Sequence, residues 1–265
     1  MPIPMTGNSS NRAVLITMPH SHYAEKARWA LDWLSLPYSE EPHVPLLHRI
    51  ATTRNGGRSV PVLVHGARRY IDSTEIMVYA DSVCGGDRLY PRDTAQRRLV
   101  ETLEEQFDEV LGPHTRRWAY AQLLPDRGLL RKMMSRGVPR AEASLLPMIM
   151  PIVIPAVRAG LRITSDSAQR SMQRVCGIFR EVDERLADGR GFLVGERLTA
   201  ADLTFASLAS PVLLPAGCRA AYPELDEVPA TMREEVLRLR DTEAGRFVLR
   251  LFSQERVRSQ MVTSG

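Results

Sequence analysis

The sequence predicts an α/β domain followed by an all-helical domain. Residues 13–84 alternate short β-rich apolar runs with amphipathic helical stretches, whereas beyond residue 94 only helical periodicity is found. A segment rich in turn-forming residues, over 85–93, separates these two halves. The chain has 265 residues, which is more than a single hydrophobic core usually supports, so two domains fit better than one.

The first half is expected to read β-α-β, then a β-hairpin, then a helix. Its expected elements are a strand over 13–17, a helix over 23–34, strands over 38–44, 60–64 and 69–71, and a helix over 72–79. Pro61 lies inside the third strand and has no N–H to donate to a sheet. It therefore indicates an edge strand, a bulge or a cis peptide bond.

The second half is expected to be helical over 94–118, 168–186 and 200–209. Thr199 and Asp202 have the spacing of a capping box, which satisfies free N–H groups at a helix start. Residues 126–139 are basic and are expected to be irregular or exposed. The apolar run over 145–161 is shorter than the roughly 20 residues of a membrane span. It also contains three prolines, so we expect a buried, kinked helix, with a membrane-contacting surface as the lesser alternative.

Composition narrows the possible functions. The formal net charge is +4 and opposite charges interleave, so nucleic-acid binding is not expected. Three well-separated cysteines are too few for a disulfide framework or a metal site, which favours a reducing cytoplasm and no metal. Residues 1–12 have no apolar core, so we expect a polar tail and not a signal peptide.

Two serines each precede an expected helix, and each has two interpretations. Ser21 follows the first strand, and Ser73 follows the acidic Asp72. The simplest role of either serine is to cap the helix. The same positive helix terminus also attracts anions, so Ser21 could donate to a thiolate and Ser73 to a carboxylate.

Four motifs in this order make the chain similar to the cytosolic glutathione transferase family, and it resembles the serine-type members of the tau, zeta and theta kind. The motifs are Ser21 with the following segment to Leu31, Val60-Pro61-Val62-Leu63, Asp72-Ser73, and Gly195 with Thr199, Ala201 and Asp202. The resemblance covers most of the chain and implies a thioredoxin-like glutathione-binding domain over 13–84, a linker over 85–93 and a helical domain over 94–265. It also implies a homodimer, and a bacterial source is expected.

The resemblance implies a role for each residue of the site. Ser21 would activate the glutathione sulfur, and Val60, turned outward by cis-Pro61, would pair with the cysteinyl backbone. Asp72 and Ser73 would hold the γ-glutamyl end. The glycyl carboxylate needs a cation, for which Arg58 and His48 are the candidates.

The sequence departs from the family pattern in two places. Histidines flank Ser21, where we expect solvated loop residues, and the stretch over 120–167 is longer than usual. This stretch falls where the family binds its hydrophobic electrophile, for which His114, Trp118 and Tyr120 are candidate pocket residues. Three functions stay open: a glutathione transferase, a non-catalytic ligand-binding or membrane-associated relative, and a glutathione-dependent isomerase or dehalogenase.

Overall fold

A computed structural model describes residues 12–259 of the chain. The expected polar tail over 1–12 lies outside the described residues, apart from Arg12.

The N-terminal domain is built on a four-stranded mixed sheet. Its strands are β1 (Ala13–Thr17), β2 (Tyr38–Pro42), β3 (Val62–His65) and β4 (Arg68–Tyr70), in the order β2-β1-β3-β4. β1 pairs in parallel with β2 and antiparallel with β3, and Leu15 of β1 lies opposite Leu63 of β3. β3 and β4 form an antiparallel hairpin. The expected strand pattern is therefore present, although β3 begins after Pro61 and not before it. The Val60–Pro61 bond is cis.

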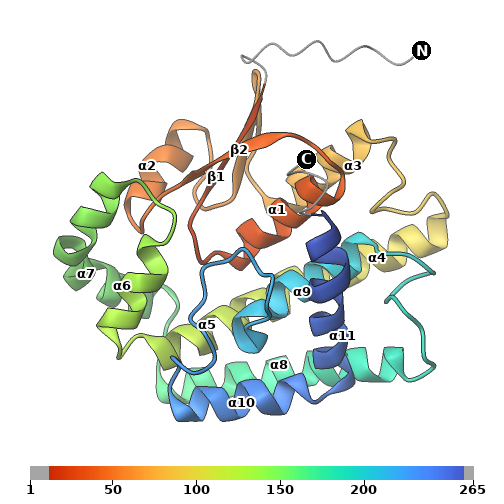
Figure 1. Cartoon of the computed structure of the whole chain (residues 1–265). Helices are drawn as coiled ribbons and strands as arrows, with labels where there is room; N and C mark the ends of the chain where they lie inside the picture. Colours follow the sequence, from red (N-terminus) through yellow and green to blue (C-terminus); the bar gives the residue numbers. More distant parts are fainter. Residues whose placement is uncertain (1–11, 260–265) are drawn as a thin grey trace.

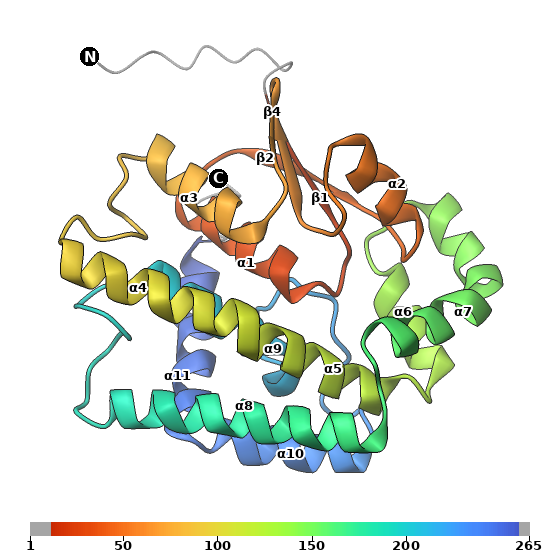
Figure 2. The same cartoon turned by 180° about the vertical axis from the view of Figure 1, so that it is seen from behind.

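Three helices accompany the sheet: α1 (His22–Trp33), α2 (Leu47–Arg54) and α3 (Ser73–Val83). α1 packs on α3, while α2 lies apart from them, against β1 (Figures 1 and 2). Residues 84–93, which connect this domain to the next, contain no helix or strand.

The C-terminal domain is entirely helical. Its helices are α4 (Thr94–Gln106), the π-helical segment η2 (Phe107–Leu111), α5 (Gly112–Leu123), α6 (Arg127–Ser135), α7 (Arg140–Gly160), α8 (Ser165–Leu186), α9 (Ala200–Leu213), α10 (Ala230–Arg240), α11 (Glu243–Leu251) and the π-helical segment η3 (Phe252–Arg256). α9 lies at the centre, with every residue buried, and packs on α4, α5, α10, α11 and α1. The expected capping box starts it: the Asp202 carboxylate accepts from the Thr199 N–H at 2.7 Å.

The sequence expectation for residues 126–139 is wrong, because they contain helix α6. Asp126 caps this helix by accepting from the Leu129 N–H at 2.9 Å. The basic residues suggested exposure of the whole segment, but they occupy only the outer face of the helix. Four apolar residues at helical spacing are buried on the inner face: Leu129, Leu130, Met133 and Met134.

The helix expected over 145–161 is present as part of α7, but the expectation that it is buried is wrong. α7 has 21 residues, and only Leu146, Met150 and Val153 are buried. By length and composition alone α7 could cross a membrane, but core helices of soluble proteins pass the same test. Figure 1 shows α6 and α7 together at one end of the molecule, beyond the end of α5. The high apolar content of α7 is therefore no sign that its side chains are buried.

Candidate functional site

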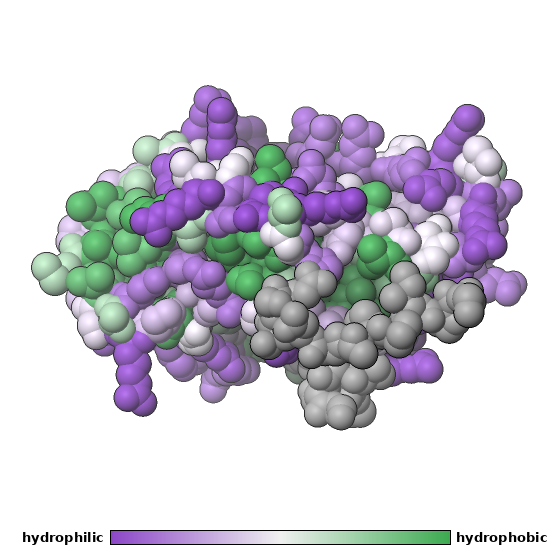
Figure 3. All heavy atoms as spheres, turned by 90° about the horizontal axis from the view of Figure 1, so that it is seen from above, coloured by the Kyte–Doolittle hydropathy of each residue, from purple (hydrophilic) through white to green (hydrophobic). Residues whose placement is uncertain are grey.

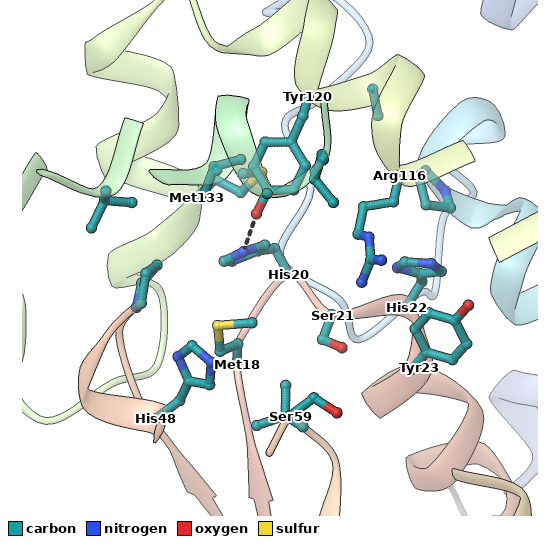
Figure 4. A pocket seen from close by; sticks show the side chains of 18 of the residues that line it. Met18, His20, Ser21, His22, Tyr23, His48, Ser59, Arg116, Tyr120 and Met133 are labelled. Atoms are coloured by element: carbon teal, nitrogen blue, oxygen red, sulfur yellow. Dashed lines mark hydrogen bonds between the residues drawn. The ribbon is translucent and has the colours of Figure 1, made fainter. Parts of the chain in front are cut away.

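A cavity of about 400 Å³ lies between the two domains. Its walls come from the β1–α1 loop, α2, the segment before the cis-proline, α5, α6, α7 and the loop after α9. Figure 4 shows histidine, serine, tyrosine and arginine side chains gathered around it. Its lining residues include Met18, His20, Ser21, His22, Tyr23, His48, Arg49, Arg58, Val60, Arg116, Tyr120, Met133, Val153, Val157, Leu161 and Tyr222.

Ser21 caps α1 and lines the cavity at the same time. Its Oγ accepts a hydrogen bond from the Ala24 N–H at 3.1 Å. Accepting this bond uses an oxygen lone pair and not the hydroxyl hydrogen, so Ser21 keeps a donor to offer to a ligand. The capping interpretation and the ligand-binding interpretation of Ser21 are therefore compatible.

The histidines on either side of Ser21 are buried, not solvated as the sequence suggested. Burial lowers the pKa of His20 to about 4, with further contributions from His48 and Arg28. Burial and then Arg116 lower the pKa of His22 to about 3. His22 Nε2 lies 3.1 Å from the Gly112 carbonyl of α5, so it joins the domains. Both imidazoles are neutral at pH 7.

His20 also makes a hydrogen bond across the domain boundary. Its Nε2 lies 2.8 Å from the Tyr120 hydroxyl, and its Nδ1 has no hydrogen-bond partner among the described residues (Figure 4). The tautomer of the neutral imidazole decides which of the two groups donates. Either tautomer leaves one donor of this pair, the Tyr120 O–H or the His20 Nδ1–H, without an acceptor in the described part of the chain and available to a ligand.

The cavity has a positive electrostatic character. Arg49, Arg58 and Arg116 line it, and none of its described lining residues is aspartate or glutamate. His48 also lines it, and burial followed by Arg49 lowers the pKa of this histidine to about 4. Such a set of groups favours an anionic ligand over a cationic one.

The structure brings together only some of the predicted site residues. Ser21, Val60, Arg58, His48 and Tyr120 line the cavity. The remaining predicted residues, which do not line it, are Pro61, Asp72, Ser73, His114 and Trp118.

Asp72 and Ser73 lie at the start of α3. The Asp72 carboxylate caps this helix by accepting from the Thr74 N–H at 2.7 Å, and the Ser73 side chain is buried. Of the predicted pocket residues, Trp118 is buried in the core. His114 lies between α5 and α8, where its Nδ1 is 3.0 Å from the Ser171 hydroxyl.

A buried ion cluster near the α3 start escaped the sequence interpretation. Lys26 of α1 contacts Asp108 at 2.5 Å and Glu104 at 3.0 Å, and its Nζ donates to the Thr74 hydroxyl at 2.9 Å. Tyr23, also on α1, donates its hydroxyl hydrogen to the Asp108 carbonyl at 2.9 Å. No local pattern predicts these contacts, because they join residues at least 48 positions apart.

Arg116 and Tyr222 were missed as cavity residues for a similar reason. Arg116 lies one turn before Tyr120 on α5, so the helical spacing from that residue was the available signal. Tyr222 comes from a loop after α9, and no pattern in the sequence places that loop.

The sequence and the fold both match one family. Residues 15–87 match the N-terminal domain of glutathione S-transferases and residues 142–235 match the C-terminal domain. Together the two matches cover more than half of the chain. Among curated proteins, none matches this sequence.

Several solved structures share the fold. One is a glutathione transferase, GSTFuA3, from Phanerochaete chrysosporium, with a TM-score of 0.59 and 16% identity, covering 91% of this chain and 96% of that one. A beta-etherase, LigF, from Sphingobium sp. has a TM-score of 0.55 and 18% identity, with 90% and 98% covered. A theta class glutathione transferase from Xanthomonas axonopodis pv. citri, with glutathione bound, has a TM-score of 0.54 and 16% identity, with 90% and 97% covered.

These identities establish a common architecture and not a common substrate. With its thioredoxin-like domain followed by a helical domain and its matches to both domain sequences, the chain belongs to the glutathione S-transferase family.

Proposed function

We propose that the protein is a glutathione transferase of the serine type, which activates the glutathione thiol for attack on a hydrophobic electrophile. One observation supports this most: Ser21, at the start of α1, and Val60, which precedes the cis-proline, line the same arginine-bordered cavity. One ligand can therefore meet a hydroxyl that donates to its thiolate, a backbone position that pairs with its peptide, and the positive field of the arginines.

The thiolate is stabilised by three features of the cavity. The Ser21 hydroxyl donates to the sulfur, the N-terminus of α1 contributes a positive field, and Arg116 adds a full charge. A thiol has a pKa of about 8.5. Lowering it by two units requires about 2.7 kcal/mol of thiolate stabilisation. One charge-assisted hydrogen bond contributes roughly 1.5–3 kcal/mol, so these groups together are sufficient.

The peptide ends of glutathione are held on both sides of the sulfur. Val60 pairs with the cysteinyl backbone. Arg58 supplies the cation for the glycyl carboxylate, and His48, whose lowered pKa of about 4 leaves it neutral at pH 7, supplies a hydrogen bond and not a charge. The Arg58 and His48 side chains both line the cavity, which supports this assignment. At the other end, the N-terminus of α3 with Asp72 and Ser73 binds the γ-glutamyl group. This last assignment depends on the helix terminus, because the cavity does not include either residue.

The electrophile lies against the apolar wall formed by Met133, Val153, Val157 and Leu161. A carbon–sulfur bond forms as the thiolate attacks, and the bond to the leaving group breaks with its electron pair. Burial raises the pKa of Tyr120 to about 12, so its hydroxyl stays protonated at neutral pH and donates a hydrogen bond to an oxygen of the electrophile.

The test combines retention on immobilised glutathione with turnover of a chlorinated dinitroarene by the wild type and by Ser21→Ala. Retention with turnover that the substitution lowers is the expected result. Retention with no turnover, unchanged by the substitution, would instead support a non-catalytic ligand-binding protein. Absence of retention would exclude glutathione as the bound thiol.

We also propose a cytoplasmic homodimer. Val78 and Val83 of α3 and Leu99 of α4 are exposed apolar residues, which supports a covered face in this region. Gel filtration of the wild type and of Val83→Glu tests this: the expected dimer should dissociate in the variant, and a monomeric wild type would contradict the proposal.

A further inference from the structure

We propose that α7 forms a docking surface for the anionic face of a lipid bilayer. This docking surface is defined by the exposed apolar side chains of Leu145, Met148 and Ile152, together with Arg140 and Arg158 near the two ends of α7. The proposal goes beyond the transferase function and is independent of it.

The apolar part of the surface is exposed to an unusual degree. Met148 is 75% exposed and Ile152 is 61% exposed. Figure 3 shows apolar side chains gathered at the end of the molecule where α2, α6 and α7 lie. Glu142 is the last charged residue before Arg158, so the outer face is uncharged for about four turns. Contiguous apolar surface of this kind marks a contact with another molecule or with a membrane.

Charge indicates which of these occupants the surface fits. Residues 126–164 contain seven arginines or lysines and two acidic residues, a formal charge of +5, whereas the whole chain has +4. Lys132 is paired with Glu227 from outside this stretch, so the segment that carries the apolar stripe keeps a net positive charge after that pair is counted. Two copies facing each other here would bring like charges together. An anionic lipid surface is complementary to both the charge and the apolar side chains.

The prolines of α7 indicate contact with the bilayer surface and not a membrane span. Pro147, Pro151 and Pro155 lie on the exposed side, and each removes one hydrogen bond to the carbonyl four residues earlier. Within hydrocarbon these carbonyls would have no partner, whereas at the headgroup level water satisfies them. A helix lying in the interface accommodates such a sequence.

The side of α7 that faces away from the docking surface lines the cavity. Val153 and Val157 of this helix line the cavity between the domains. The helix that would contact lipid is therefore also a wall of the cavity, and docking brings the cavity close to the medium in which apolar molecules concentrate.

The test is flotation of the full chain with vesicles of phosphatidylcholine alone or with about 30% phosphatidylglycerol. The wild type should bind the anionic vesicles at least tenfold more tightly, and added salt should weaken this binding. The double substitution Met148→Gln with Ile152→Gln should weaken binding at least tenfold. Arg140→Gln and Arg158→Gln should each weaken it about fivefold.

Leu237→Gln, at an apolar position on α10 that is 49% exposed, is the control and should bind as the wild type does. Thermal unfolding checks that all variants fold. Equal binding to both vesicle types, absence of binding, or normal binding by the Met148/Ile152 variant would overturn the proposal. So would a dimer that this variant dissociates while its vesicle binding is unchanged, because a second copy would then cover the surface.

Discussion

Helix α1 borders two buried polar regions that differ in how their groups are paired. One is an ion cluster formed by Glu25, Arg28 and Asp32 of α1 with Glu40 and Arg256, in which each charged side chain is paired with an opposite charge. Arg256 donates to Glu25 at 2.8 Å and to Asp32 at 2.7 Å, and Arg28 contacts Glu40 at 2.6 Å. Because Arg256 comes from the C-terminal domain and the others from the N-terminal domain, these pairs hold the two domains together.

At the N-terminus of α1, the cavity contains polar groups without partners. His20 Nδ1, His48 Nδ1 and Arg116 Nε are buried and have no hydrogen-bond partner among the described residues, and Arg256 Nη2 of the ion cluster has none either. The difference lies in where these groups stand: His20, His48 and Arg116 line the cavity, whereas Arg256 is held between two carboxylates away from it. One region therefore stabilises the fold, and the other keeps hydrogen-bonding capacity where a ligand can reach it.

Arg256→Met should have the largest effect, because it leaves Glu25 and Asp32 buried without their main partner. We expect the free energy of unfolding to fall by about 3–5 kcal/mol, with catalysis at low temperature largely retained. Chemical denaturation measures the loss. Arg246→Met, at an exposed pair with Glu243, is the control and should change little. Equal effects of the two substitutions would contradict the structural role of the cluster.

His20→Gln should alter the pH dependence of stability. The folded pKa of His20, about 4, is below the unfolded value of 6.5, so the unfolded state binds more protons between these values. The wild type should therefore lose stability as the pH falls from about 6.5 to 4, by up to roughly 3 kcal/mol from this residue. The variant should lose less over the same range, as denaturation at several pH values would measure. Parallel curves would disprove the assignment.

Ser21→Ala should lower kcat/KM by about tenfold to a hundredfold, because it removes a charge-assisted hydrogen bond to the thiolate. It should also cost about 1 kcal/mol of stability through the lost helix cap. Steady-state kinetics and thermal unfolding separate the two effects. A loss of stability with unchanged kinetics would leave Ser21 with the capping role alone.

Tyr120→Phe should produce the smallest measurable loss, about twofold to tenfold in kcat, and only with electrophiles that carry an oxygen near the reacting carbon. His114→Ala is the matched control on the same helix, since His114 does not line the cavity. It should leave kcat within about twofold of the wild type, because its partners Ser171 and Arg117 do not line the cavity either. A larger loss of kcat in His114→Ala than in Tyr120→Phe would show that the electrophile binds near His114 and not near Tyr120.

Sequence patterns between neighbouring residues predicted the order of the strands and helices. The alternating pattern predicted the strand–helix order, and the Thr199–Asp202 box marked the start of α9, because both depend on residues close in sequence. The same holds for Ser21, whose position before a helix was visible in the sequence.

Distant contacts and exposure could not be predicted in this way. The apolar residues of α7 suggested burial, yet which of them face solvent depends on the few elements that pack against this helix. His20 looked like a solvated loop residue because its partner, Tyr120, is 100 positions away. The set of residues that forms the cavity is likewise a result of how the two domains pack.

The most direct test of thiol activation by Ser21 is the pKa of bound glutathione, followed by thiolate absorbance over a pH titration of the wild type and Ser21→Ala. We expect a pKa well below the free value of about 8.5 in the wild type and a rise of at least one unit in the variant. An unperturbed pKa in the wild type, or the same pKa in both proteins, would contradict the claim that this cavity activates glutathione through Ser21.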